Sequence, residues 1–341
     1  MLTRSETYFI KGIAISMMLF HHLFSFPERV PDIFNYNDVG ILLVSFSYFG
    51  KICVPIFMIL SGYGFFVSGN KGFYYLISKI SCFFISCWLV LLVFIPLGAI
   101  ISEGTHGLTY FELVLNATFI SSSYNNEWWF AKFYIFCLLC LPAIYKISDR
   151  PMLILFLTIF LYLISKVFIR LDNSYFNVMS DFIFWLSVFL LGFYLASSDF
   201  FSFINGLSER ASSRPLYFLV LIFLLAFLTK KISYNLNFLV IISPVVMFFI
   251  LLLCRCSPNI ISRFFAELGN KSMYIWLTHS FYCYYFFSEF IYWFNNAIFV
   301  FIILLIISYL TSLVLTKLEI SLRSTYRTLK NSSTSYFRGG I

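Results

Sequence analysis

Long apolar runs are the feature that most constrains how this chain can fold. About 20 apolar residues are enough for a helix to cross the hydrocarbon core of a bilayer. The sequence has ten runs of about this length, at residues 8–26, 50–68, 76–100, 128–146, 151–169, 177–197, 215–229, 236–254, 272–293 and 296–316. Hydrophobic residues make up 61% of the 341 residues and charged residues 11%, whereas soluble domains carry about 25% charge. We therefore expect an all-α polytopic integral membrane protein with about 10 transmembrane helices.

The segments outside these runs are short or polar. Residues 27–49 begin polar and become apolar from Val39, and residues 109–121 are mixed, so each is expected to hold a short interfacial or re-entrant helix. The first run is longer than the apolar core of a signal peptide and lacks a small-residue cleavage site, so it should remain as a helix. We expect one membrane domain over residues 1–316. The basic, Ser/Thr-rich residues 317–341 should form a cytoplasmic tail that frays or lies on anionic lipid.

Lys and Arg are distributed unequally between the two sides of the membrane. If the N-terminus is inside, the outer loops carry about a third as many Lys and Arg residues as the inner side. The outer residues are Arg29, Lys166, Arg170, Lys230 and Lys231. The positive-inside rule then puts both termini in the cytoplasm. The net charge of +8 therefore reflects topology, and nucleic-acid binding is not expected. The outer loop 101–127, by contrast, carries three glutamates and no Lys or Arg.

The first apolar run contains three ionisable side chains, Lys11, His21 and His22. Such groups are costly to bury in a membrane and usually mark a site. In an α-helix, Lys11 and His22 lie within roughly 20° of one face and about 16 Å apart along the axis, whereas His21 points about 80° away. With Ile15 and Met18 between them, this face is apolar between two polar ends, which suits the wall of a buried cleft. We take it as the candidate active-site helix.

Four stretches resemble a known family. Lys11-Gly-Ile-Ala-Ile, followed after ten residues by His22, resembles the basic-x10-His signature of the membrane acyltransferase-3 family. Three more occur in family order: VPIFMILSGYGFF at 54–66 is similar to its FFxLSGF helix, WWFAKFYIFCLLCLP at 128–142 to its Trp-Phe/Tyr-led helix ending in Pro, and ELGNKSMYIWLTHSF at 267–281 to its LGxxSxxIYLxH segment. Together they span nearly the whole chain. Members of the family move acyl groups, commonly acetyl, onto sugar hydroxyls of cell-surface glycans.

The resemblance implies an O-acetyltransferase of a bacterial inner membrane. The donor would be acetyl-CoA, and the acceptor a lipid-linked or surface polysaccharide such as an O-antigen or exopolysaccharide. Transfer to a hydroxyl needs a group that removes its proton, and a histidine titrating near neutrality suits that task. The family match points to His22 as this general base, with His21 orienting or replacing it. A covalent acetyl-histidine intermediate is the alternative.

The same resemblance suggests residues for the acyl donor. Lys11, where the family usually has Arg, would help to hold the donor phosphates, although it is also placed like a snorkelling anchor. Many relatives begin the third helix with Arg-x-x-Arg, and here Lys79 is the one cation left, with Lys71 nearby. Ser61 lies in a Ser-Gly-Tyr-Gly patch that either contacts substrate or lets helices pack closely.

Further residues are expected along a substrate channel. His279 matches the family histidine. Counted along the helix from residue 272, it lies about 10 Å from the inner face of the membrane, whereas His22, counted from Tyr8, lies about 21 Å from that face. The two histidines therefore need not touch. Glu127 and Trp129 fit either an outer interface belt or a sugar-stacking site. Lys132 and Tyr134, one turn further along, are expected to line the cavity.

The cysteines indicate neither a metal site nor disulfides, and one rival function remains open. The eight cysteines lie in or beside apolar runs, where thiols act as small hydrophobes, so we predict neither a metal site nor disulfides. A transporter or flippase of lipid-linked sugars could also use intramembrane Lys and His, but such proteins often show internal repeats, which we do not find. The oligomeric state is not indicated by the sequence.

Overall fold

The computed structural model describes residues 1–101, 109–171, 173–203 and 235–338, including side chains except those of residues 37–38 and 326–338. All regular elements in these ranges are helical. The predicted span at 215–229 and Glu103 of the outer loop lie outside the described residues.

Eight described helices are long and apolar enough to cross a membrane. They are α1 (Arg4–Phe24); Ile41–Ser68, made of α2 (Ile41–Phe49), η3 (Gly50–Ile52) and α3 (Cys53–Ser68); α4 (Phe73–Ile101); Asn126–Tyr145, made of η4 (Asn126–Trp129) and α6 (Phe130–Tyr145); α7 (Pro151–Ile169); α8 (Ser174–Ser197); α11 (Leu236–Cys256); and α15 (Ala297–Arg338). The chain is thus an all-helical, multi-pass membrane protein, as its composition predicts.

Shorter helices complete the described structure. They are η1 (Pro27–Arg29), η2 (Tyr36–Val39), α5 (Tyr110–Ala117), η5 (Phe200–Phe203), α12 (Asn259–Asn270), α13 (Ser272–Ser280), the π-helix η6 (Phe281–Phe286) and α14 (Ser288–Tyr292). The short helices expected within 27–49 and 109–121 are present, although α2 runs on into α3 through a single 3-10 turn.

Two predicted segments differ from the structure. The run at 272–293 is not one helix: it is divided into α13, η6 and α14, and α12 precedes it with only Lys271 between. Hydropathy did not reveal these breaks, because aromatic and apolar residues occur in all three pieces and no Gly or Pro separates them. The other segment is the tail after residue 316, where α15 continues as a helix to Arg338 in place of a frayed chain, while its placement on anionic lipid stays a prediction. No Gly or Pro occurs between Ala297 and Arg338 to end the helix.

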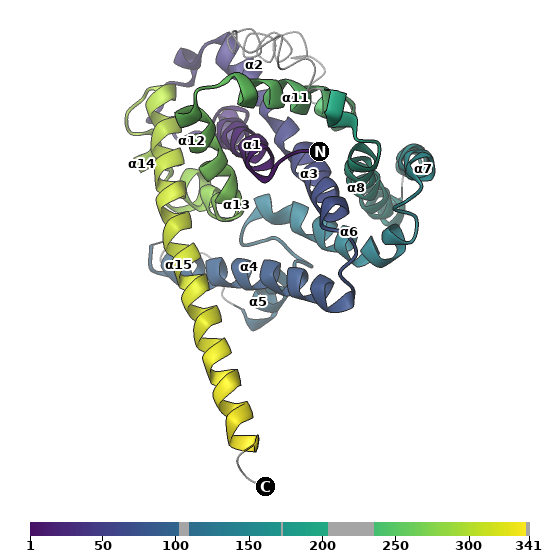
Figure 1. The fold of residues 1–341 in the computed structure, drawn as a ribbon. Coiled ribbons are helices and arrows are strands. Elements are labelled where there is room, and N and C mark those ends of the chain that lie inside the picture. Colours follow the sequence, from purple (N-terminus) through teal and green to yellow (C-terminus); the bar gives the residue numbers. More distant parts are fainter. Residues whose placement is uncertain (102–108, 172, 204–234, 339–341) are drawn as a thin grey trace.

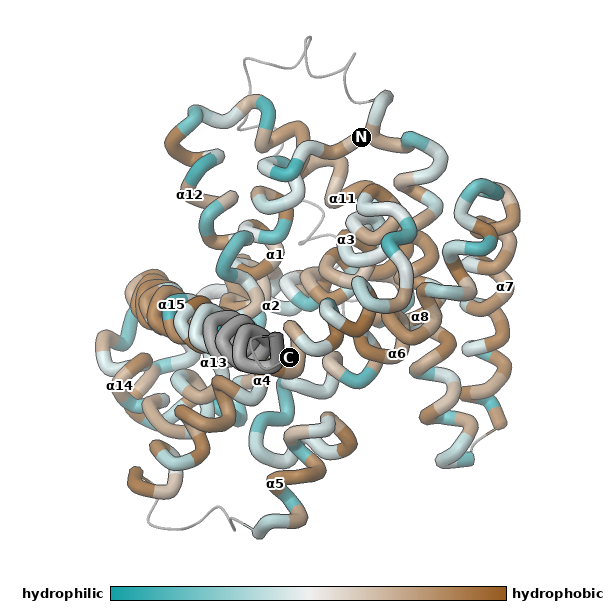
Figure 2. Tube along the Cα trace, turned by 60° about the horizontal axis from the view of Figure 1, so that its bottom comes forward, coloured by the Kyte–Doolittle hydropathy of each residue, from teal (hydrophilic) through white to brown (hydrophobic). Residues whose placement is uncertain are grey.

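Helix α1 lies at the centre of the bundle. It packs against α2, α3, α11, α12, α13 and α15. In Figure 1, which looks nearly along α1, α12 and α13 lie on one side of it and α3 on the other, with α8 and α7 beyond α3. The C-terminal part of α15 projects from the bundle. Figure 2 shows that the long outer helices are mostly hydrophobic, and α7 exposes Met152, Phe156 and Leu163, as a lipid-facing helix should.

Glycine pairs hold two helix crossings at backbone contact. A Cβ atom on Gly12 of α1 would lie 1.8 Å from the Phe265 carbonyl oxygen of α12, and one on Gly269 would lie 1.8 Å from the Tyr8 oxygen. Gly62 of α3 and Gly192 of α8 form the second crossing in the same way. Small residues allow such close approach between membrane helices. The packing role expected for the Ser61-Gly62 patch is therefore confirmed at Gly62.

Candidate active site

A cavity of about 340 Å³ opens along one face of α1. Its polar lining is Lys11, His21, His22, Lys51, Ser61, Glu127 and Ser272, and the rest is apolar or aromatic: Met18, Phe26, Cys53, Val54, Phe57, Phe83, Trp129, Phe130, Tyr134, Met273 and Trp276. Lys11, Met18 and His22 of the predicted face line it, but Ile15 does not, and His21, which was expected to point about 80° away, also lines it. An apolar cavity with a few polar groups at defined positions is the usual form of a small-molecule site.

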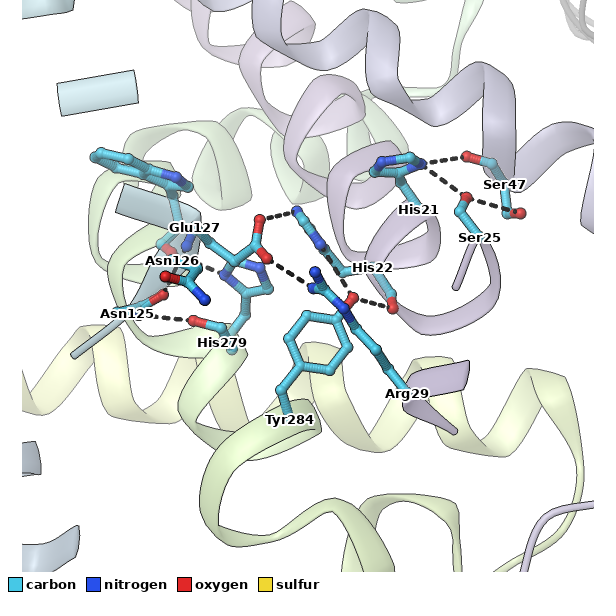
Figure 3. A network of polar contacts seen from close by, with 12 residues as sticks. His21, His22, Ser25, Arg29, Ser47, Asn125, Asn126, Glu127, His279 and Tyr284 are labelled. Carbon is cyan, nitrogen blue, oxygen red and sulfur yellow. Dashed lines mark hydrogen bonds and ion pairs between the residues drawn. The ribbon is translucent and has the colours of Figure 1, made fainter. Parts of the chain in front are cut away.

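His22 lies in the last turn of α1 between groups from two other segments (Figure 3). Its Nε2 atom is 3.5 Å from Oε2 of Glu127, and its Nδ1 atom is 3.1 Å from the Tyr284 hydroxyl. The same hydroxyl donates to the His22 carbonyl oxygen. His22 and Glu127 are each 11% exposed, so both are shielded from bulk water.

Glu127 is held from both sides. Its backbone N–H donates to the side chain of Asn125, which caps η4, and its Oε1 atom is 2.9 Å from Nη1 of Arg29. The Arg29 guanidinium also stacks on Phe26 and Tyr284, 4.6 and 4.8 Å from the ring centres. Partial burial opposes the charge on Arg29, but the hydrogen bond that Arg29 donates to Glu127 and the proximity of Tyr284 and Glu127 outweigh it and raise the pKa of Arg29. Arg29 therefore remains a cation beside Glu127.

His21 is fixed in a separate buried network. Its Nδ1 atom is 2.9 Å from the Ser47 carbonyl oxygen and 2.8 Å from the Ser25 hydroxyl, which contacts the Ser47 hydroxyl in turn (Figure 3). A carbonyl oxygen only accepts, so Nδ1 carries the hydrogen and Nε2 is the unprotonated nitrogen. These bonds fit the orienting role considered for His21.

His279 packs directly against His22, with ring centres 4.8 Å apart. Its depth was therefore predicted wrongly, because the helical segment begins at Asn259 in α12 and not at residue 272. Counted from the contact between Gly12 and Gly269, each histidine lies ten positions further along its own segment. His279 is fully buried, its Nδ1 atom donates to the Trp276 carbonyl oxygen at 2.8 Å, and Nε2 has no hydrogen-bond partner among the described residues.

A family model described as an acyltransferase domain matches residues 9–317, which include every residue of this cavity. The chain belongs to the acyltransferase-3 family. No curated protein and no solved structure matches it significantly. Membership makes the chain an acyltransferase, and the cavity beside α1 is its candidate active site.

The acyltransferase brings most of the predicted site residues together. Lys11, His21, His22, Ser61, Glu127, Trp129 and Tyr134 all line the cavity. Lys11 makes no hydrogen bond or ion pair in the described part of the chain, which leaves its charge available to an anion. The Ser61 hydroxyl donates to the Phe57 carbonyl oxygen at 2.7 Å within its own helix.

Other predicted residues lie outside the cavity. Lys71 and Lys79 lie 5.1 and 5.2 Å from the ring centre of Tyr75, and Lys71 lines a separate hollow of about 200 Å³ near the end of α3. Lys132 does not line the acyltransferase cavity: it is exposed, with its ammonium 5.1 Å from the Phe133 ring centre. Phe130 and Tyr134 share the cavity face at i,i+4 spacing, and Lys132 lies about 200° around the helix from Phe130.

Sequence reasoning missed two residues that contact the His22 site. Arg29 was assigned only as a topological charge in an outer loop. Tyr284 is one of several aromatic residues in 281–287, and nothing in that run distinguishes it. A π-helix is the reason it reaches His22, and no pattern in the residues indicated that helix.

Proposed function

We propose that this acyltransferase moves an acetyl group from acetyl-CoA to a sugar hydroxyl of a bacterial surface polysaccharide, an O-antigen or exopolysaccharide. The proposal rests on one observation. One cavity joins Lys11, a half-buried cation with no partner among the described residues, to the imidazole of His22, which lies between a carboxylate and a tyrosine. The proposed location is the bacterial inner membrane, with both termini in the cytoplasm.

The donor enters from the end of the cavity at Lys11. With the N-terminus of α1 in the cytoplasm, this end faces the compartment that contains coenzyme A. A lysine ammonium can bind a phosphate as a point charge. Lys11 and His22 are eleven positions apart, and this is about 16 Å along a helix. The anionic part of the donor and its thioester can therefore occupy opposite ends of the cavity.

The acceptor reacts at the end of the cavity at His22. Nε2 of His22 takes the hydroxyl proton as the sugar oxygen forms a bond to the thioester carbonyl carbon. The carbon–sulfur bond then breaks, and the proton passes from Nε2 to the thiolate of coenzyme A. Glu127 faces Nε2, so its negative charge stabilises the imidazolium that exists between the two proton transfers. Trp129, at the same cavity, supplies an aromatic face for a sugar ring.

A covalent route would use the same residues. There, Nε2 attacks the thioester first, and the acetyl-imidazole then gives its acetyl group to the hydroxyl. Incubation with radiolabelled acetyl-CoA in the absence of acceptor separates the two routes. Label retained on wild type and lost in His22→Ala supports the covalent route, whereas no retained label supports direct transfer.

The decisive test measures O-acetyl groups on the surface polysaccharide by NMR. A host deleted for the gene is complemented with wild type, His22→Ala or Lys132→Ala at matched membrane levels, since Lys132 lies outside the cavity. Acetyl signal with wild type and Lys132→Ala, and its loss with His22→Ala, is the expected result. Acetyl signal restored by His22→Ala would exclude His22 as the base. Loss of the polysaccharide itself in the deletion host would favour the rival function, transport of lipid-linked sugars.

A further inference from the structure

The carbonyl groups at the end of α1 are all bonded. The last four carbonyls of a helix have no partner within it, and such groups are costly to leave unpaired in an apolar surrounding. The His21 oxygen accepts from the Ser25 backbone N–H at 2.9 Å. The next three oxygens, of His22, Leu23 and Phe24, accept from the hydroxyls of Tyr284, Tyr292 (2.8 Å) and Tyr36 (2.5 Å) respectively.

We call Tyr36, Tyr284 and Tyr292 the tyrosine collar. They come from three separate elements, η2, η6 and α14, and meet at one helix end. Burial raises the pKa of Tyr36 to about 12, so its hydroxyl keeps the proton that it donates throughout the neutral range. The collar therefore fixes where α1 ends, one turn after the histidine pair.

Tyr284 differs from the other two collar residues. Its oxygen also lies 3.1 Å from Nδ1 of His22. A tyrosine hydroxyl has one hydrogen, and the carbonyl oxygen of His22 can only accept it, so the hydroxyl donates to the carbonyl. The second contact then requires Nδ1 to carry a hydrogen and to donate it to the tyrosine oxygen. Nε2 is left unprotonated, on the side of Glu127.

Three hydrogen bonds join the segment that carries Glu127 to the segment that carries Tyr284. Asn125 donates to the Ser280 hydroxyl at 2.7 Å, Trp128 donates to the Leu277 carbonyl oxygen at 3.1 Å, and the Asn126 backbone donates to the Tyr285 hydroxyl at 3.1 Å. These bonds fasten the segment that carries Glu127 to the α13–η6 segment that carries Tyr284. The two partners of the His22 ring, Glu127 and Tyr284, are therefore held by one connected set of hydrogen bonds. Short π-helical segments within α-helices are frequent at functional sites.

We propose that Tyr284 is a positioning residue that holds His22 in the Nδ1–H tautomer and so presents Nε2 as the base, while Tyr36 and Tyr292 only close the helix end. This inference rests on the proposed function in one respect, the role of His22 as the base. The tautomer itself is a property of the resting protein and is measurable without turnover.

The test compares Tyr284→Phe with Tyr292→Phe, which removes the same kind of bond from the neighbouring carbonyl without touching the His22 ring. Protein labelled with nitrogen-15 histidine and held in lipid nanodiscs gives the tautomer from the two ring-nitrogen shifts, and His22→Ala assigns the His22 signals. We expect Nδ1–H in wild type and Tyr292→Phe, and a shift towards Nε2–H in Tyr284→Phe. Acetyl transfer should fall about 10- to 100-fold in Tyr284→Phe alone, as it does when a partner that orients a histidine is lost.

Several outcomes would overturn the inference. A wild-type His22 with its hydrogen on Nε2 contradicts it, even if Tyr284→Phe fails to fold. Equal spectra and equal rates for Tyr284→Phe and Tyr292→Phe also contradict it. Full activity of His22→Ala together with the expected tautomer shift would instead refute the proposed base and leave the role of Tyr284 in holding the tautomer intact.

Discussion

Nε2 of His22 lies 3.5 Å from Oε2 of Glu127, and Oε1 of the same carboxylate is 2.9 Å from Nη1 of Arg29. Glu127 thus contacts both the part-exposed Arg29 and the imidazole of His22, which is 11% exposed. A carboxylate beside an imidazole favours the protonated imidazole, whereas a permanent cation nearby opposes it, so the charge of Glu127 has to offset that of Arg29 when His22 takes up a proton. Glu127 therefore belongs to the chemistry of His22 in our interpretation, and is more than a residue of an interface belt.

The first prediction concerns the charge of Glu127. Glu127→Gln keeps the shape of the side chain but removes the charge that would stabilise the His22 imidazolium. We expect kcat for acetyl transfer to fall on the order of 10²-fold, the size of typical acid–base contributions. The KM for acetyl-CoA should change little, because Lys11 is at the other end of the cavity. Glu112→Gln in α5, which lies outside the cavity, is the matched control, and equal rates for the two variants would show that the charge of Glu127 is not used.

The second prediction concerns Arg29. The pKa of Arg29 is higher in the folded protein than in the unfolded chain. Any stabilisation from the Arg29–Glu127 pair is therefore fully present below the pKa of arginine in the unfolded chain. It is lost only as the pH rises through the higher pKa of the folded protein. Across pH 6 to 9 the pair should therefore stay constant. Arg29→Lys keeps a cation but loses the planar stacking on Phe26 and Tyr284. We expect it to lower activity less than Arg29→Ala does, with the same pH–rate profile as wild type over that range; a profile that moves with Arg29→Lys would contradict this.

The sequence predicted the α1 side of the site and several residues of other segments, but it missed Arg29, Tyr284 and the contact between His22 and His279. Helical spacing alone put Lys11, Met18 and His22 on one face, because 3.6 residues per turn fixes that geometry within a single helix. The contact between His22 and His279 depends on where α12 begins and on how Gly12 and Gly269 cross. These are tertiary facts that hydropathy does not contain. The spans were predicted well where apolar runs have polar ends, and poorly at 272–293, where aromatic residues continue through every break.

The third prediction tests the crossing that sets this register. Gly12→Ala and Gly269→Ala would each place a Cβ atom 1.8 Å from a backbone carbonyl oxygen, which no side-chain rearrangement can relieve. We expect each substitution to destabilise the protein by about 1–3 kcal/mol, the usual range for overpacking in a core. The measurement is thermal unfolding in detergent. Gly64→Ala in α3 is the control, since a Cβ atom there meets nothing within 4 Å, and its effect should stay within about 0.5 kcal/mol. Equal stability of all three variants would mean that the helices do not cross at these glycines.

The last prediction separates donor binding from membrane anchoring at Lys11. The side chain lines the cavity and makes no ion pair in the described residues. If it binds a phosphate of the donor, Lys11→Gln should raise the KM for acetyl-CoA about 10-fold or more, since a hydrogen bond to a charged group contributes about 1.5–3 kcal/mol. The kcat at saturating donor should stay within a few-fold of wild type, because His22 and Glu127 are untouched. Lys132→Gln, an exposed lysine outside the cavity, is the control for loss of a membrane-segment cation. An unchanged KM with reduced insertion of Lys11→Gln into membranes would identify Lys11 as an anchor and shift donor binding to Lys51 or to the lysines around Tyr75.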